Sequence, residues 1–182
     1  RVLYPNDTTY EGKVLRVRQQ YFFCSATLQE LIDNYVEHHG ANLNGFADFN
    51  AIQLNDTHPV IGVPELMRVL VDEKKLEWDA AWAITQQCFA YTCHTLLPEA
   101  LEVWSVDLIG RLLPRHLEII YRINVQHLAL AEARAPGDID FRASVSLILA
   151  GLAAESDVFD NLVERATLRG ELAEMGLEEL LT

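Results

Sequence analysis

Apolar residues recur every three or four positions along the first forty residues of the chain. The series comprises Val14, Val17, Tyr21, Cys24, Leu28, Leu31 and Tyr35. This spacing brings all of its members to one face of an α-helix. It predicts a single long amphipathic helix from about Gly12 to His38, closed by Gly40 and by the turn-forming residues at 42–45.

A short apolar run from Ala51 to Leu54 comes next, too brief for a helix and bounded by turn-forming residues, and it predicts a strand. A polar run comes directly after it: Asn55, Asp56, Thr57, His58 and Pro59. In open α/β sheets, ligands bind beyond the carboxyl ends of the strands. The polar run is therefore the first candidate for a binding site.

Prolines and apolar spacing predict several further helices. Pro64 suits a first helical turn, and Pro98 and Pro114 mark two later helix starts. The apolar positions assigned to these helices are Leu66, Val69 and Leu70; then Trp78, Trp82, Ala83 and Phe89, in a helix ending near 91–95; and then Leu117, Ile120, Tyr121 and Leu128. The turn at 136–138 ends the last of them, so the chain reads as helix-rich α/β.

The last thirty residues differ in composition from the rest. The stretch from Gly151 to Thr182 contains eight acidic residues and only two basic ones, Arg165 and Arg169, so its net charge is −6. Interspersed leucines allow one or two amphipathic helices there, and a solvated acidic helix packing its leucines on the body is the favoured interpretation. We therefore divide the chain into a body, 1–149, and an acidic helical tail, 150–182.

Composition excludes several functional classes. The net charge of −13, from 14 basic and 27 acidic residues, argues against nucleic acid as a partner. The three cysteines form no CxxC pair, so neither a disulfide framework nor a zinc site is predicted, and a reducing cytoplasmic location fits. The longest apolar run, near 145–154, is too short to cross a membrane. The chain begins at Arg1 with neither a methionine nor a charged-then-apolar leader, so no targeting signal is predicted, and it reads as part of a longer protein.

Two catalytic or metal-binding interpretations receive little support from spacing. Asp56 and His58 could form a metal or acid–base pair only if the strand continued, and Pro59 ends it. Cys93 beside His94 could form a nucleophile–base pair, but sequence neighbours rarely align for proton transfer and no third orienting group is identifiable. Both alternatives stay open at this point.

Taken in order, the motifs of the body resemble those of the α-glucan phosphorylases, the glycogen, starch and maltodextrin phosphorylases. The resemblance covers residues 1–149 and is carried by YPND at 4–7, EGK at 11–13, RQQYFF at 18–23, ATLQEL at 26–31, IQLNDTHP at 52–59, PELMRVLVDE at 64–73, AYTCHTLLPEALEVW at 90–104, LLPRHLEIIYRIN at 112–124 and PGD at 136–138. The acidic tail does not resemble the corresponding segment of that family.

The resemblance implies a fold and a reaction. The chain would be part of the N-terminal domain of a glycosyltransferase-B-type enzyme and would form one wall of a glucosyl pocket. Such enzymes cleave terminal α-1,4-glucosidic bonds of a glucan or maltodextrin with inorganic phosphate, giving glucose 1-phosphate. Pyridoxal phosphate serves there as a proton donor or relay through its own phosphate.

The resemblance also implies roles for individual residues. The backbone carbonyl of His94 would bind the sugar at the cleavage subsite and help to stabilise an oxocarbenium-like state. The polar residues implied at the substrate pocket or its gating loop are Asn6, Asp7, Asp56, His58, Thr95 and Glu102. A sugar carries many hydroxyls, so such a wall needs both donors and acceptors.

Some positions depart from the family pattern. Thr8 and Cys93 each stand where Asn is usual, and Val103 stands where Arg is usual. Asp33 and Asn34 occupy the places of two arginines that bind the nucleotide phosphate in AMP-regulated members. Asp33 would repel a phosphate, so activation by AMP is not expected.

The cofactor-binding part of the family pattern is missing from this chain. The Schiff-base lysine belongs to a region of the family that the chain does not match, so we expect no bound pyridoxal phosphate in this chain alone. Two hypotheses result: part of a phosphorylase that is inactive in isolation, or a non-catalytic interaction module derived from a phosphorylase segment. In either case, apolar faces cut from a larger domain predict self-association.

Overall fold

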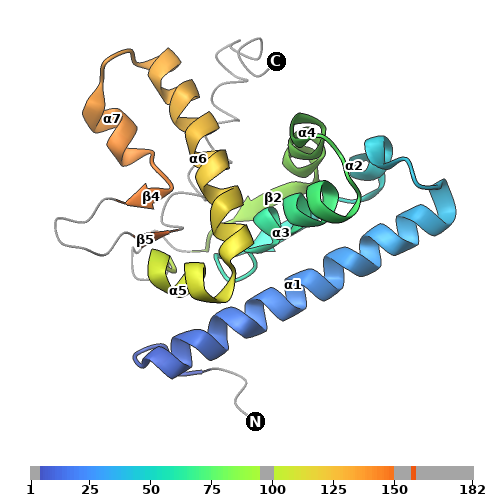
Figure 1. Cartoon of the computed structure of the whole chain (residues 1–182), viewed down its shortest axis with the longest axis horizontal. Helices are drawn as coiled ribbons and strands as arrows, with labels where there is room; N and C mark the ends of the chain where they lie inside the picture. Colours follow the sequence, from blue (N-terminus) through green and yellow to red (C-terminus); the bar gives the residue numbers. More distant parts are fainter. Residues whose placement is uncertain (1–4, 95–100, 150–156, 159–182) are drawn as a thin grey trace. The chain divides into compact units, whose positions relative to one another are not determined.

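The computed structural model describes residues 5–94, 101–149 and 157–158 (Figure 1). The chain divides into two compact units, residues 1–94 and 95–182. Each unit has its own set of buried residues.

The predicted N-terminal helix is confirmed as α1, Tyr10–His39. It begins because the Thr9 side chain accepts a hydrogen bond from the Gly12 N–H at 3.1 Å, and it ends at Gly40, whose φ of 84° suits glycine. Val17 and Leu28 of the predicted stripe are buried, together with Ile32. The helical period of apolar residues therefore identified the packed face of this helix.

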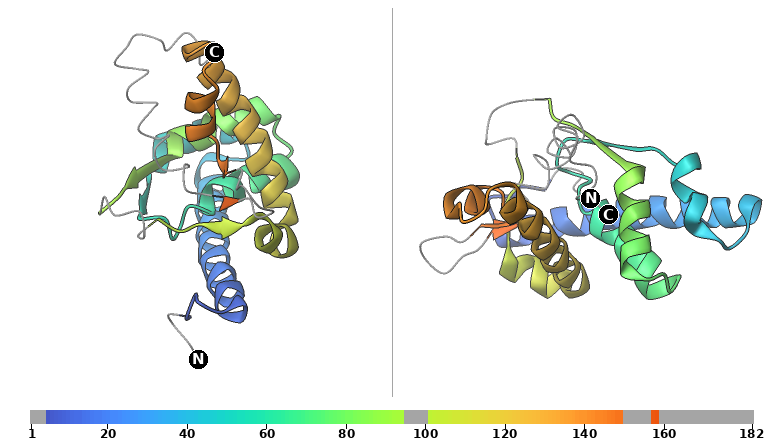
Figure 2. Two further views of the ribbon diagram at one scale, coloured as in Figure 1. Left: turned by 90° about the vertical axis from the view of Figure 1, so that its left-hand side faces the viewer. Right: turned by 90° about the horizontal axis from the view of Figure 1, so that it is seen from above.

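The first unit continues through short elements. They are η1 (Leu43–Gly45), α2 (Phe46–Phe49), β1 (Ile52–Asn55), α3 (Gly62–Arg68), the π-helical turn η2 (Val69–Glu73), α4 (Trp78–Cys88) and β2 (Phe89–Thr92). Of these, α2 and α3 pack against α1. α1 runs unbroken past α3, and α3 packs on α4 (Figure 2). The largest fully buried side chains of this unit are Phe46, Ile32, Leu66, Met67, Leu70, Glu65 and Val69.

The predicted strand at 51–54 is observed as β1, and it has an unpredicted partner. β1 pairs in parallel with β2, with Ile52 opposite Phe89 and Asn55 opposite Thr92. The expectation of a helix running to 91–95 is wrong, because α4 ends at Cys88. Residues 89–92 are extended. Their backbone groups form ladder hydrogen bonds with β1 in place of helical hydrogen bonds.

The second unit is built on the helix that starts at Pro114, as predicted. Its elements are β3 (Trp104–Ser105), α5 (Val106–Leu112), α6 (Pro114–Arg134), α7 (Ile139–Ser144), β4 (Ile148–Leu149) and β5 (Asp157–Val158). α7 folds back beside α6 after the turn at 135–138 (Figure 1). The short strands form an antiparallel sheet in the order β3-β5-β4.

The buried face of α6 includes the predicted Ile120 but not the predicted Tyr121. Ile119, Ile120 and Ile123 are buried, whereas Tyr121, assigned to the core by its spacing, is 41% exposed. The isoleucines offer a stripe with the same period, and the helix buries that one against its neighbours.

The described part of the chain is thus helix-rich with a short parallel strand pair, in agreement with the α/β class expected. None of its helices is both long enough and apolar enough to cross a membrane. The predicted helix start at Pro98 and nearly all of the predicted acidic tail lie outside the described residues.

Candidate functional site

The polar run after β1 and the residues after β2 meet at one edge of the parallel pair. Parallel strands bring their carboxyl ends to the same edge, so residues far apart in sequence become neighbours there. We call this group the strand-end site and define it as Asn55, Asp56, Thr92 and His94. At its border the Gln53 amide donates a hydrogen bond to the Thr92 hydroxyl.

Asp56 connects the two strands through both its backbone and its side chain. Its N–H donates to the Thr92 carbonyl at 2.9 Å, and its Oδ1 accepts from the His94 N–H at 3.3 Å. Its φ of 58° lies in the left-handed region, which Asp and Asn adopt more readily than most residues. The chain therefore turns sharply at Asp56 while the residue still contacts β2 and the segment after it.

His94 is held by its ring as well as by its backbone. The ring Nε2 donates to Oδ1 of Asn55, the last residue of β1. A neutral ring that donates through Nε2 keeps Nδ1 as an acceptor. The site therefore presents an orientated histidine, an exposed residue whose position is set by two neighbours on β1 and the turn after it.

The turn after Asp56 places His58 against α1. Thr57 is buried, and His58 is exposed with its Nδ1 accepting from the Arg16 guanidinium at 3.3 Å. Arg16 also lies 3.9 Å from the Asp7 carboxylate. Arg16 thus links two of the predicted site residues, Asp7 and His58, that are distant in sequence.

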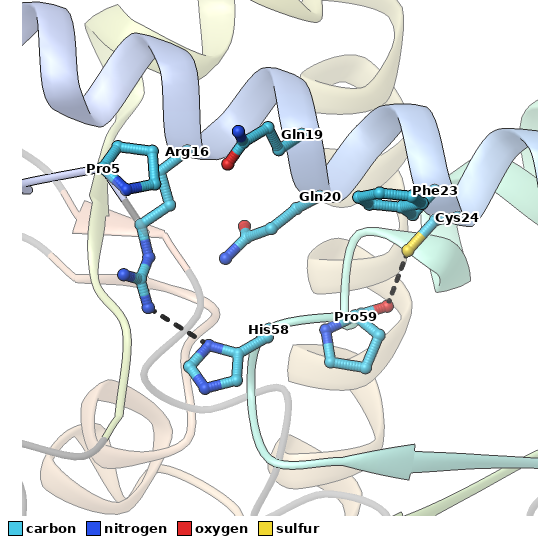
Figure 3. Close-up of a pocket in the computed structure, with 8 residues that line it drawn as sticks. All are labelled: Pro5, Arg16, Gln19, Gln20, Phe23, Cys24, His58 and Pro59. Carbon is cyan, nitrogen blue, oxygen red and sulfur yellow. Dashed lines mark hydrogen bonds between the residues drawn. The ribbon is translucent and has the colours of Figure 1, made fainter. Parts of the chain in front are cut away.

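A cavity of about 310 Å³ opens beside this contact (Figure 3). It is lined by Pro5, Arg16, Gln19, Gln20, Phe23, Cys24, His58 and Pro59. Its lining combines an aromatic ring and two prolines with two amides, a guanidinium and an imidazole. Figure 3 shows Arg16 reaching from α1 to His58 among the residues that line the cavity.

The segment before α1 is held close to the first turn of that helix. A Cβ added at Gly12 would lie 1.5 Å from the Asn6 carbonyl oxygen, so only glycine allows this approach. The Asn6 side chain accepts from the Thr8 N–H at 3.0 Å. The predicted gating residues Asn6 and Asp7 are exposed, in a turn fixed by local hydrogen bonds.

Burial makes the cysteine and tyrosine near these residues unreactive as bases. Burial raises the pKa of the Cys24 thiol to about 11, and this thiol donates to the Pro59 carbonyl at 3.5 Å. The pKa of Tyr91 is also raised, first by burial and then by the neighbouring Cys93. The thiolate is the nucleophilic form of cysteine, so a raised pKa makes the Cys24 thiol a poor nucleophile at neutral pH.

Neither alternative chemistry gains support from the described geometry. The His94 Nε2 bonds to Asn55, and the Asp56 carboxylate receives the His94 N–H. The described residues contain no cluster of three or more His, Cys, Asp or Glu side chains that could hold a metal ion. The strand-end site instead offers donors and acceptors suited to a polyhydroxylated ligand.

Besides Asn6, in the turn before α1, the predicted site residues fall into three groups. Asp56 and His94 are brought together directly, and Asp7 and His58 are brought together through Arg16. Thr95 lies outside the described residues, and Glu102 belongs to the second unit. Arg16 was not predicted, because nothing in its own stretch of sequence distinguishes it from any solvent-facing helix arginine.

The lysines of the chain do not fit the pyridoxal phosphate implied by the resemblance. A Schiff base needs a lysine amine inside the site. The only lysines are Lys13, Lys74 and Lys75; all three are exposed, and the Lys75 amine donates to the Asp72 carbonyl at 2.6 Å. No described group can therefore hold this cofactor covalently.

Comparison with known families gives one extended match. The profile of the carbohydrate phosphorylase family matches residues 1–156. This range includes every residue of the strand-end site and the whole lining of the cavity.

Individual proteins match the same part of the chain. Glycogen phosphorylase 2 of Dictyostelium discoideum is 54% identical over 147 residues, 81% of this chain and 15% of that protein. Glycogen phosphorylase of Chlamydia trachomatis is 48% identical over 168 residues, 92% of this chain and 20% of that protein. The liver form of human glycogen phosphorylase is 54% identical over 155 residues, 81% of this chain and 18% of that protein. The chain thus spans at most about a fifth of these relatives.

Proposed function

The chain belongs to the carbohydrate phosphorylase family, and from this premise we propose that it forms part of the glucosyl pocket of an α-glucan phosphorylase. The reaction would transfer a glucosyl unit from an α-1,4-glucan or maltodextrin to inorganic phosphate. The fold would be part of the N-terminal domain of a glycosyltransferase-B-type enzyme.

The observation that carries this proposal is the strand-end site within the family match. Two segments 38 residues apart meet there, and their side chains hold His94 by its ring and its peptide N–H. A sugar-binding wall needs fixed donors and acceptors at a strand edge, which is what this arrangement supplies.

Each residue of the site has a proposed role. The His94 carbonyl oxygen carries partial negative charge, which would favour the positive charge that develops at the anomeric carbon in the transition state. Asp56 and His58 would line the sugar pocket, and Thr95 and Glu102 would complete its polar wall. Asn6 and Asp7 would form the loop that controls access.

The remaining chemistry would come from parts of the enzyme outside these 182 residues. Pyridoxal phosphate would supply acid–base chemistry through its phosphate, held by a lysine other than the three exposed ones present here. The isolated chain would then be inactive and would bind maltodextrins only weakly, with dissociation constants of about 1 mM or above, near −4 kcal/mol. A cytoplasmic location fits the cysteine content.

A segment exchange tests the proposal. The matched segment of human liver glycogen phosphorylase would be replaced by that of this chain, and phosphorolysis of glycogen would be measured beside the unmodified enzyme. We expect activity within about tenfold of the parent, because more than half of the residues are identical.

The same exchanged enzyme separates the possible roles of Cys93 and His94. Cys93→Ala should keep nearly full activity, because the proposed contact uses the His94 carbonyl and no thiolate. A dead Cys93→Ala enzyme would favour the nucleophile interpretation. An inactive exchanged enzyme that folds and binds its cofactor would favour the non-catalytic interaction module instead.

A further inference from the structure

We propose that the Asp56 carboxylate is a positioning group that takes the place of a backbone carbonyl in the β1–β2 ladder and so holds the peptide of His94. The proposal rests on the function proposed above, because its effect on catalysis depends on the His94 carbonyl. Its structural part concerns only the first unit and stands on the geometry of the two strands.

The register of the parallel pair shows which hydrogen bond the carboxylate replaces. Asn55 lies opposite Thr92, so the next pair would be Asp56 with Cys93. In a parallel ladder a residue donates to the carbonyl before its partner and accepts from the N–H after it. Asp56 does donate to the Thr92 carbonyl, and the regular ladder would have its own carbonyl accept from the His94 N–H.

The observed acceptor of the His94 N–H is the Asp56 side chain. Its Oδ1 lies 3.3 Å from the His94 nitrogen. The reason is the backbone torsion, since a φ of 58° turns Asp56 out of the extended conformation. The ladder therefore gains one further bond after the strand has already turned toward Thr57 and His58.

The carboxylate and its neighbour together limit the freedom of His94. The bond to Asp56 fixes the peptide plane before the His94 Cα, and the bond from the ring Nε2 to Asn55 fixes the side chain. The two bonds together restrict the φ torsion of His94, because the Cβ position follows from that torsion. Relative to this held peptide, the direction of the His94 carbonyl then depends on the ψ torsion.

Aspartate meets both requirements of this position. It tolerates the left-handed region, and it reaches the His94 N–H with an oxygen acceptor whose charge strengthens the bond. Asparagine keeps both properties without the charge. Glycine adopts the left-handed torsion but has no side-chain acceptor, and alanine provides neither. Substitution of Asp56 by Asn, Gly and Ala therefore separates the effects of the torsion, the acceptor and the charge.

The first test is amide hydrogen exchange of the 182-residue chain, measured for the His94 N–H. Asp56→Asn should keep the protection of this amide within about threefold, and Asp56→Gly should lower it about tenfold or more, because the acceptor is lost. Asp33→Asn, an exposed charge removal on α1, is the matched control and should change nothing. Unchanged protection of the His94 amide in Asp56→Gly would overturn the proposal. Equal loss of this protection in Asp56→Asn and Asp56→Gly would also overturn it.

The second test uses the exchanged phosphorylase and separates positioning from direct binding. Asp56→Gly should lower kcat about tenfold with little change in KM, since a carbonyl that acts on the transition state is misplaced, and Asp56→Asn should restore most of kcat. An equal rise of KM in both variants would identify Asp56 as a direct sugar ligand and would contradict a positioning role.

The two tests fail independently. If the exchange measurement succeeds and the exchanged enzyme is inactive with an intact Asp56, the positioning bond stands and the proposed function is wrong. If the exchanged enzyme is active and Asp56→Gly leaves both kcat and His94 protection unchanged, the positioning role is wrong and the proposed function stands.

Discussion

Glu65 is a fully buried carboxylate, and Arg68 reaches it from the next turn of the same helix. The guanidinium donates through Nε to Oε2 at 2.7 Å and through Nη2 to Oε1 at 2.9 Å. A second contact, at 2.8 Å, joins Arg68 to Glu73. The hydrogen bond with Glu65 raises the pKa of Arg68, so the guanidinium keeps its charge throughout the physiological range.

Replacing Arg68 with methionine should destabilise the first unit by about 3 kcal/mol, because Glu65 would lose both hydrogen bonds from the guanidinium while remaining buried. Urea unfolding followed by tryptophan fluorescence would measure the loss. Arg111→Met is the control, since its ion pair with Asp107 is more than half exposed and should change stability by about 0.5 kcal/mol or less. Equal urea midpoints for Arg68→Met and Arg111→Met would contradict the expectation that a buried ion pair contributes more to stability than an exposed one.

At the scale of elements, a buried amide on α6 fixes the segment that leads into β4. The Asn124 Oδ1 accepts from the Leu147 N–H at 2.7 Å, and its Nδ2 donates to the Ser146 hydroxyl at 3.3 Å. Leu147 itself is 1% exposed, so its N–H has no access to water as a substitute partner. One side chain thus joins a helix to a segment more than twenty residues later.

Asn124→Leu should cost about 2 kcal/mol of unfolding free energy in the second unit, because the buried Leu147 N–H loses its acceptor. The exchange rate of the Leu147 amide should also rise. Chemical denaturation would measure the loss of stability, and hydrogen exchange would measure the Leu147 amide. Val125→Ala, on the exposed side of the same helix, should leave both unchanged. A Leu147 amide that stays protected in Asn124→Leu would mean that another acceptor replaces the amide.

Among elements, the predictable ones are those whose hydrogen bonds are local. The α1 helix results from its own apolar period, its Thr9 cap and its terminal Gly40, all within one stretch of sequence. β2 was assigned to a helix because Phe89 continues the apolar period of α4, and only the partner strand β1 makes the extended form favourable. A strand four residues long carries too little pattern of its own to be identified.

At the scale of the whole molecule, α1 displays two large aromatic side chains to solvent. Phe22 and Phe23 are 65% and 62% exposed, with ring centroids 5.5 Å apart in an edge-to-face arrangement. Exposed aromatic groups of this kind favour association. The net charge of −13 opposes it through repulsion between copies, so the balance depends on salt.

Self-association of the 182-residue chain should increase with salt and should weaken in the double variant Phe22→Ser, Phe23→Ser. Screening removes the repulsion at high ionic strength, and the substitutions remove apolar area. Sedimentation velocity at several concentrations and two salt levels would measure both effects. Ile139→Ser, an exposed apolar residue of the second unit at 70%, is the control. A monomer under every condition would refute the expectation.

The sequence by itself determined the family, the long first helix and the polar run after β1. These depend on residue identity and on short-range periodicity, which are both read directly along the chain. It also placed His94 and Asp56 in the same site, through the resemblance of their motifs.

Only the tertiary structure decided how these groups contact one another. The Asp56 carboxylate meets the His94 N–H across 38 residues, and Arg16 meets His58 across 42. Both contacts depend on the register of β1 against β2 and on the packing of α1 against α3, and neither leaves a local mark in the sequence. Helices are encoded by neighbours in sequence, whereas a site built on a parallel strand pair is encoded by the register between two distant segments.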